Sequence, residues 1–128
     1  MKELKEAILN IYNNSTELKN SVYGFYFVSD KKATKTPYIR VETISGFSTF
    51  RMSGKDELFR VQFTIFTKDE DFCYEILQLV KNAFDDVELI YTNYQNIQCR
   101  SFNENGILFD GEMFSYVIEY EIIRAKLN

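Results

Sequence analysis

The clearest pattern along the chain is a strand followed directly by a helix, between Phe59 and Phe84. Apolar residues occupy every second position from Phe59 to Ile65, which predicts a strand with one apolar face. Beyond a polar break, apolar residues recur at helical spacing and predict a helix over about residues 69–84, with Asp69 as its N-cap. The apolar helical positions are Phe72, Cys73, Ile76, Leu79, Val80, Ala83 and Phe84.

Similar patterns predict the other elements. A helix is expected from Lys2 to about Tyr12, with Ser15 or Thr16 as a cap for one further turn. Strands are expected over the following ranges: 22–28, 38–44 after Pro37, 87–91 and 96–102. The last strand, within 112–126, alternates most clearly, and its length favours a bulge or a strong bend.

Turn residues near the C-terminus predict a hairpin. Asn-Gly at 105–106 and Asp-Gly at 110–111 are both turn signals, but they lie too close together for two full strands between them. We therefore expect one hairpin with Ile107, Leu108 and Phe109 at its tip. The order of elements predicts one α+β domain over residues 1–128. Its sheet is expected to be antiparallel, or else mixed, with an N-terminal helix and a second helix at about 69–84 packed on one face.

The segment from Ser45 to Glu57 is the least regular part of the chain. Gly46 and Gly54 interrupt it, yet three large apolar residues lie between them: Phe47, Phe50 and Met52. A soluble monomer seldom places such groups on a loop. Two interpretations remain open: these residues fold back over the edge of the core, or the segment is a partner-contact loop or an extended hairpin.

Composition changes this picture in two ways. The chain has 15 Lys and Arg against 19 Asp and Glu, a net charge of −4, which argues against a dedicated nucleic-acid-binding protein. The basic cluster of Lys31, Lys32, Lys35 and Arg40 is best explained as a solvated loop. The chain also has 12 Phe and 9 Tyr, and such residues favour strands and interfaces.

Candidate chemistry is sparse. The chain has no histidine, which removes Ser-His-Asp and Cys-His catalytic arrangements and the commonest zinc ligand. No phosphate-binding glycine motif occurs, and the two cysteines, Cys73 and Cys99, are expected to be buried thiols. No signal peptide or membrane-spanning run is visible. We therefore predict a cytoplasmic protein that is not an enzyme and has no cofactor and no metal site.

The order of elements carries a resemblance. It rests on Thr36-Pro37-Tyr38-Ile39-Arg40-Val41, Ser45-Gly46, the strand Phe59–Phe66, the helix Phe72–Phe84 and the closing strand Met113–Ile123. From about Lys2 to Lys126 the chain resembles the tail-completion or tail-terminator proteins of long-tailed, siphovirus-like bacteriophages and prophages.

The resemblance implies a structural part of the virion, assembled in the cytoplasm of a bacterial host. Proteins of this kind form a ring, typically a hexamer, that ends polymerisation of the tail tube and joins the tail to the head connector, while DNA passes through the lumen without specific binding. We expect Phe47, Phe50, Arg51 and Met52 to lie in the contact between subunits. Two alternatives remain: another head–tail connector or minor tail protein, and a small-molecule-binding or enzymatic α+β domain.

Overall fold

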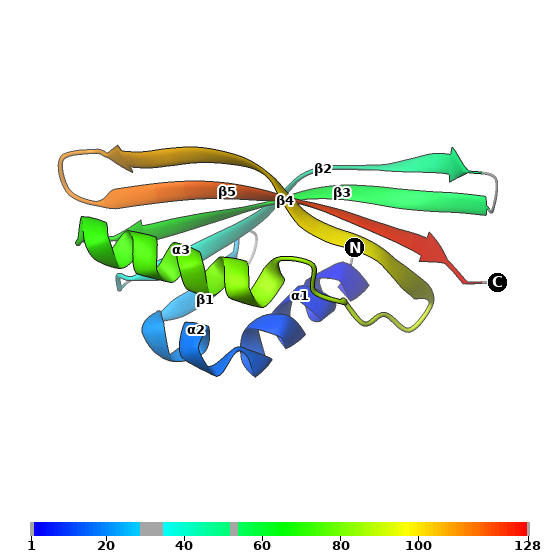
Figure 1. The fold of residues 1–128 in the computed structure, drawn as a ribbon, viewed down its shortest axis with the longest axis horizontal. Coiled ribbons are helices and arrows are strands. Elements are labelled where there is room, and N and C mark those ends of the chain that lie inside the picture. Colours follow the sequence, from blue (N-terminus) through cyan, green and yellow to red (C-terminus); the bar gives the residue numbers. More distant parts are fainter. Residues whose placement is uncertain (1, 29–34, 52–53, 128) are drawn as a thin grey trace.

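A computed structural model describes residues 2–28, 35–51 and 54–127, without the side chains of 44–51, 54 and 55. A five-stranded sheet forms one layer, and the helices of these ranges cover one of its faces (Figure 1). The predicted α+β class is confirmed. The elements in chain order are α1 (Lys2–Asn14), α2 (Thr16–Ser21), β1 (Gly24–Phe27), β2 (Tyr38–Arg51), β3 (Gly54–Thr67), α3 (Glu70–Phe84), β4 (Tyr94–Phe109) and β5 (Phe114–Lys126).

The sheet is mixed, with the order β1-β2-β3-β5-β4. β1 lies parallel to β2, whereas every other neighbouring pair is antiparallel. β3 and β5 are the central strands and pair continuously from Asp56 and Ala125 to Thr67 and Phe114. β1 is short and pairs with β2 only over Tyr38–Val41.

The strand-to-helix unit forms as predicted. Asp69 is the N-cap of α3, and its Oδ1 accepts a hydrogen bond from the Asp71 amide at 2.9 Å. Acidic Glu70 and Asp71 in the first turn suit the positive end of the helix. The helix ends at Phe84, and the chain then turns at Asp86, whose φ is 56°.

Aromatic rings dominate the core between the sheet and the helices. The ring of Phe63 on β3 lies 4.8 Å from that of Phe84 on α3 and 5.5 Å from that of Tyr120 on β5. Phe25 on β1 stacks on Tyr12 of α1 at 4.3 Å. Such contacts add about 0.5–1.5 kcal/mol each to the burial of their area. The high Phe and Tyr content therefore serves the core as well as any interface.

Residues 45–57 are not an irregular connection. β2 and β3 form one long antiparallel hairpin, paired as far as Arg51 and Gly54. Of the two interpretations that the sequence left open, the extended hairpin is the one observed. Ladder pairing with the neighbouring strand overrides the local turn tendency of Gly46 and Gly54.

The C-terminal hairpin is confirmed, but its turn lies later than predicted. Gly106, with φ 73°, lies within β4, between the paired residues Glu104 and Ile107, where one extra residue makes a bulge. The turn is formed by residues 110–113, with Gly111 at φ 94°. The Asp110 Oδ1 accepts hydrogen bonds from the amides of Glu112 and Met113 at 2.9 and 2.8 Å. The chain therefore reverses at this capped turn and not at Asn105-Gly106.

Two strand predictions were wrong. Residues 87–91 form no strand. Of the bulge or strong bend expected in β5, the bulge is absent, since the register shifts fall at residues 96–98, 101–103 and 104–107 of β4 and 43–45 of β2. β5 has paired neighbours on both sides, whereas β4 lies at the edge of the sheet, where an extra residue disturbs only one ladder. No helix in the described ranges is long and apolar enough to cross a membrane.

Candidate functional site

The predicted contact residues lie in the outer half of the β2–β3 hairpin. Phe47 pairs with Leu58, Phe50 with Lys55, and Arg51 with Gly54. Met52 lies outside the described residues, as do the side chains of the other three. Figure 1 shows that this end of the hairpin extends past the helices. The structure therefore brings Phe47, Phe50 and Arg51 onto one projecting segment, and their role in a subunit contact stays a prediction.

A buried arginine lies on the strand next to this hairpin. Arg124 of β5 is 2% exposed, and its Nε donates to Oε1 of Glu57 on β3 at 3.1 Å. Its guanidinium lies 3.7 Å from the ring centre of Tyr94 and 4.9 Å from that of Phe59. Stacking and the ion pair together offset the cost of burying the charge. The cluster ties β3, β5 and the start of β4 together.

Among the side chains that the structure describes, three buried polar atoms of this cluster have no hydrogen-bond partner. They are Nη1 of Arg124, the Tyr91 hydroxyl and Oδ1 of Asn96, which lies opposite Arg124 in the ladder. The sequence analysis missed the cluster. A signal was present, because Arg124 continues the series of alternate positions through Tyr116, Ile118, Tyr120 and Ile122 that faces the core.

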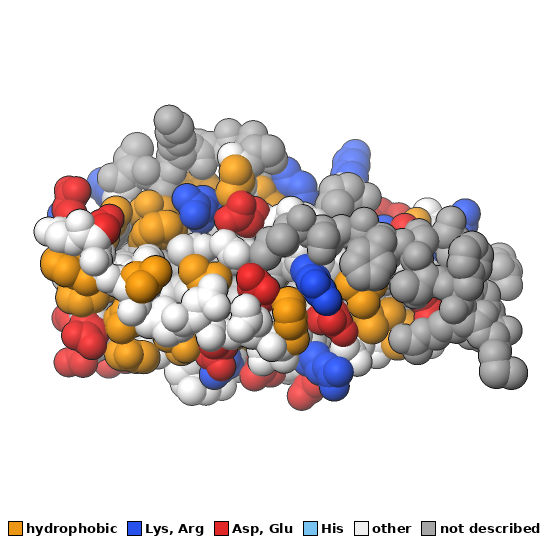
Figure 2. Space-filling model, turned by 90° about the horizontal axis from the view of Figure 1, so that it is seen from above, with side chains coloured by type: hydrophobic (Ala, Val, Ile, Leu, Met, Phe, Trp, Pro, Cys, Tyr) orange, Lys and Arg blue, Asp and Glu red, His pale blue; other side chains and the backbone are white. Residues whose placement is uncertain are grey.

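Within the described ranges no helix or strand covers the sheet face away from the helices, and its side chains are mixed in character. Figure 2 shows hydrophobic, cationic and anionic side chains interspersed over its described part. Neighbouring groups pair locally: Gln62 donates to Glu42 at 3.0 Å, and Arg40 lies 5.2 Å from the ring centre of Phe66. Of the predicted basic cluster, Lys35 is exposed as expected, Arg40 belongs to this face, and Lys31 and Lys32 lie outside the described residues.

β4 forms one edge of the sheet and exposes large apolar side chains. Ile97 and Phe102 are 45% and 41% exposed, and Leu108 is 61% exposed. Ile97 and Phe102 are the extra residues at two of the bulges. Lysine or proline often protects an edge strand from pairing with another chain, and β4 contains neither.

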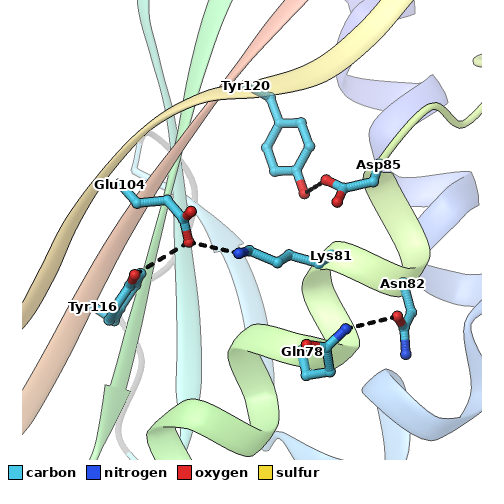
Figure 3. A network of polar contacts seen from close by, with 7 residues as sticks. All are labelled: Gln78, Lys81, Asn82, Asp85, Glu104, Tyr116 and Tyr120. Atoms are coloured by element: carbon cyan, nitrogen blue, oxygen red, sulfur yellow. Dashed lines mark hydrogen bonds and ion pairs between the residues drawn. The ribbon is translucent and has the colours of Figure 1, made fainter.

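A polar network ties β4 and β5 to α3 (Figure 3). Oε1 of Glu104 on β4 forms an ion pair with Nζ of Lys81 at 2.9 Å and accepts a hydrogen bond from the Tyr116 hydroxyl at 3.1 Å. The Tyr120 hydroxyl donates to Asp85, just past the helix, at 2.5 Å. The figure shows Lys81 pointing from α3 toward the bulged part of β4. The network positions the helix against the edge hairpin.

Both thiols are buried, as predicted. Burial, with Asp85 and Asp86 nearby, raises the pKa of Cys99 to about 12, and burial also raises the pKa of Cys73. Both thiols therefore stay protonated at neutral pH, and a protonated thiol is a poor nucleophile. Burial, together with its hydrogen bond to Asp85, likewise raises the pKa of Tyr120. This arrangement favours packing over chemistry at these groups.

The remaining chemical candidates are few. A cavity of about 530 Å³ lies beside the start of β2 and the β4–β5 turn, lined by Tyr23, Lys35, Thr36, Tyr38, Lys68, Glu112 and Met113. Two ammonium groups and one carboxylate are the charged groups of this lining. Within the described residues, no three His, Cys, Asp or Glu side chains lie together as a metal site would require. The cavity is thus the feature to which the small-molecule alternative would apply.

No protein-family model and no curated protein sequence matches this chain. A solved structure does: a chain of the virion of a native gene transfer agent particle superposes with a TM-score of 0.82 at 10% sequence identity. The superposition covers 98% of this chain and 96% of that chain. The two proteins therefore share a fold over almost their whole lengths.

Proposed function

We propose that this chain is a structural protein of a phage-like virion, and that it ends growth of the tail tube and joins the tail to the head as a ring of subunits. The observation that carries the proposal is the shared fold with a chain of a gene transfer agent virion, which extends over nearly all of both chains. The segments that carried the resemblance form helices and strands as expected, except that residues 45–51 and 54–57 belong to β2 and β3 and do not form a loop.

Two features of the surface support a role in assembly. The β2–β3 hairpin projects past the helices, so it can reach a neighbouring subunit (Figure 1). A closed ring requires that one patch of a subunit meet a different patch of the next, and a projecting hairpin and an uncovered sheet edge are two such patches. In this proposal Phe47, Phe50, Arg51 and Met52 belong to the first.

The charge distribution suits a channel that lets DNA pass. Residues 68–93 contain seven carboxylates and two lysines, and all seven carboxylates are on exposed residues. An acidic surface repels phosphates and does not retain them. In the proposed ring, DNA passes through the lumen and is not bound specifically by the chain. The proposed partners are other copies of the chain, the tail tube protein and the head connector, and the resemblance implies six copies in the ring.

Deleting the gene in the phage or particle that encodes the chain tests this function. We expect tails of uncontrolled length that are not joined to filled heads, measured by electron microscopy, with recovery when the wild-type chain is supplied from a plasmid. Tails of normal length joined to filled heads would contradict the proposal.

The same experiment separates the second candidate, another connector or minor tail protein of this fold. That role predicts tails of normal length that fail to join heads, because tube growth would still be stopped by a different protein. The shared fold supports this candidate as well. Tail length, measured separately from head attachment, therefore decides between the two.

A further inference from the structure

The sheet ends in two different edges within the described residues. β4 pairs only with β5, so its other side is an edge along the whole strand. β1 covers the outer side of β2 only at Tyr38–Val41, with one further bond from the Val28 amide to the Val41 carbonyl at 2.9 Å. Residues 44–51 of β2 therefore form a second edge, at the hairpin end.

These two edges lie at the same level across the sheet. Following the ladders, Ser45 is level with Arg60, then Glu121, then Arg100. Thr49 is likewise level with Gln95 through Asp56 and Ala125. The part of β2 that β1 covers is level with residues 104–108 of β4. The uncovered part of one edge thus matches residues 95–100 of the other.

The strand directions also match. From β2 through β3 and β5 to β4 each strand is antiparallel to the next, so β4 runs opposite to β2. A second copy placed beside the first in the same orientation would set its β2 against β4 as an antiparallel pair, which is the pairing that the sheet already uses. Neither 44–51 nor β4 contains the lysine or proline that would prevent it.

We propose that residues 44–51 of β2 in one copy pair with residues 95–100 of β4 in a second copy of this chain, so that the sheet continues across the subunit contact. The contact is heterologous, because each copy offers β2 on one side and β4 on the other, and repetition with rotation closes a ring. Backbone hydrogen bonds supply affinity, and exposed Ile97 lies beside the contact. The inference rests on the proposed ring and specifies which strands form the contact between neighbouring copies.

Cysteine cross-linking tests the pairing. One full-length chain carries Ser45→Cys with a size tag, and an untagged chain carries Arg100→Cys, or Gln98→Cys to cover a slip of one pair along the face. The two are mixed at high concentration and mildly oxidised, and they are also co-expressed where particles form. We expect a disulfide-linked heterodimer in at least one preparation. Leu108→Cys is the matched control, because it lies level with Tyr38, where β1 already covers β2.

A charge placed on the edge gives a second readout. Ile97→Lys is expected to lower the yield of the heterodimer by about tenfold, since lysine on an edge strand opposes pairing. Leu108→Lys, on a more exposed residue of the same strand, is expected to leave the yield unchanged. Both variants should keep the melting temperature of the parent.

The pairing is overturned if neither preparation gives a heterodimer, or if Leu108→Cys cross-links to Ser45→Cys as well as Arg100→Cys does. These outcomes are distinct from failure of the proposed function. Uncontrolled tail length without the cross-link rejects the contact alone, whereas a cross-link together with normal tails in the gene deletion rejects the function alone.

Discussion

β5 and β4 are neighbours joined by one tight turn, yet they differ in almost every physical respect. β5 contributes six buried residues, has no register shift against β3 and lies inside the sheet. β4 contributes one, Cys99, and is interrupted by three bulges at the edge. β5 is thus held by burial and β4 by backbone hydrogen bonds and a few polar contacts. One hairpin therefore supplies both a stabilising strand and a strand available to a partner.

The same substitution on each strand should expose this difference most strongly. Ile118→Ala on β5 removes a fully buried side chain and is expected to lower the free energy of unfolding by about 2–5 kcal/mol, through lost burial and a residual cavity. Ile97→Ala on β4, at 45% exposure, should change it by less than about 0.5 kcal/mol. Urea denaturation measures both, and equal costs would refute the contrast.

The two arginines provide the next comparison. Arg124→Ala on β5 leaves Glu57 without its ion-pair partner and empties the space between aromatic rings, so we expect a loss of about 3 kcal/mol. Arg100→Ala on β4 removes an exposed side chain and should cost less than about 0.5 kcal/mol. The melting temperature checks this pair. A small effect of Arg124→Ala would show that its ion pair and stacking barely exceed the cost of burial.

Alkaline pH tests the one buried residue of β4. The Cys99 pKa is raised from 9.0 to about 12, so above pH 9 the unfolded chain loses this proton while the folded chain keeps it. The free energy of unfolding should then fall by about 1.4 kcal/mol per pH unit for this group. A further decline is expected above pH 10, because the pKa of Tyr120 is also raised in the folded chain. Urea titrations from pH 8 to 11 measure the slope. Cys73, whose pKa is also raised by burial, adds its own part to the decline above pH 9. Cys99→Ala should therefore make the slope smaller without abolishing it, and an unchanged slope would exclude Cys99 as a source.

The smallest effect is expected at the contact between β4 and α3. Glu104→Gln weakens the ion pair with Lys81, and because both side chains are about one third exposed the cost should be about 0.5–1 kcal/mol. A double-mutant cycle with Lys81→Met isolates the pairwise term. A coupling energy near zero would mean that Glu104 holds the edge strand only through its hydrogen bond with Tyr116.

Periodic patterns predicted the parts of the fold that burial decides. The alternation through Ile118 and Ile122 and the helical spacing through Ile76 and Val80 each place apolar groups on one face, and the structure buries all four. Asp69 was predictable as a cap because its role depends only on its own helix. Local chemistry and local period were sufficient for these elements.

Other features depend on residues far apart in the sequence and could not be predicted in the same way. Gly46 and Gly54 suggested a loop, because the backbone pairing that holds them in strands involves residues of a partner strand and leaves no local signal. Gly106 looked like a turn because its bulge is defined only against β5. The ion pair of Arg124 joins residues 67 positions apart. Phe47, Phe50 and Met52 were chosen for their apolar character, together with Arg51 between them, and the role of these four residues in a contact is still a prediction.

The central pairing of β3 with β5 has a consequence for how the chain folds. The β2–β3 and β4–β5 hairpins each join strands that are close in the sequence. Pairing β3 with β5 instead requires contacts such as that of Glu57 with Arg124, which are 67 residues apart with α3 between them. Closing so long a loop costs chain entropy before any contact compensates for it, and folding slows as such pairings dominate. Until that step, β3 and β5 are themselves exposed edges rich in Val, Ile and Phe. The strands that give the folded chain its stability are thus the ones most prone to aggregation while the chain is being made.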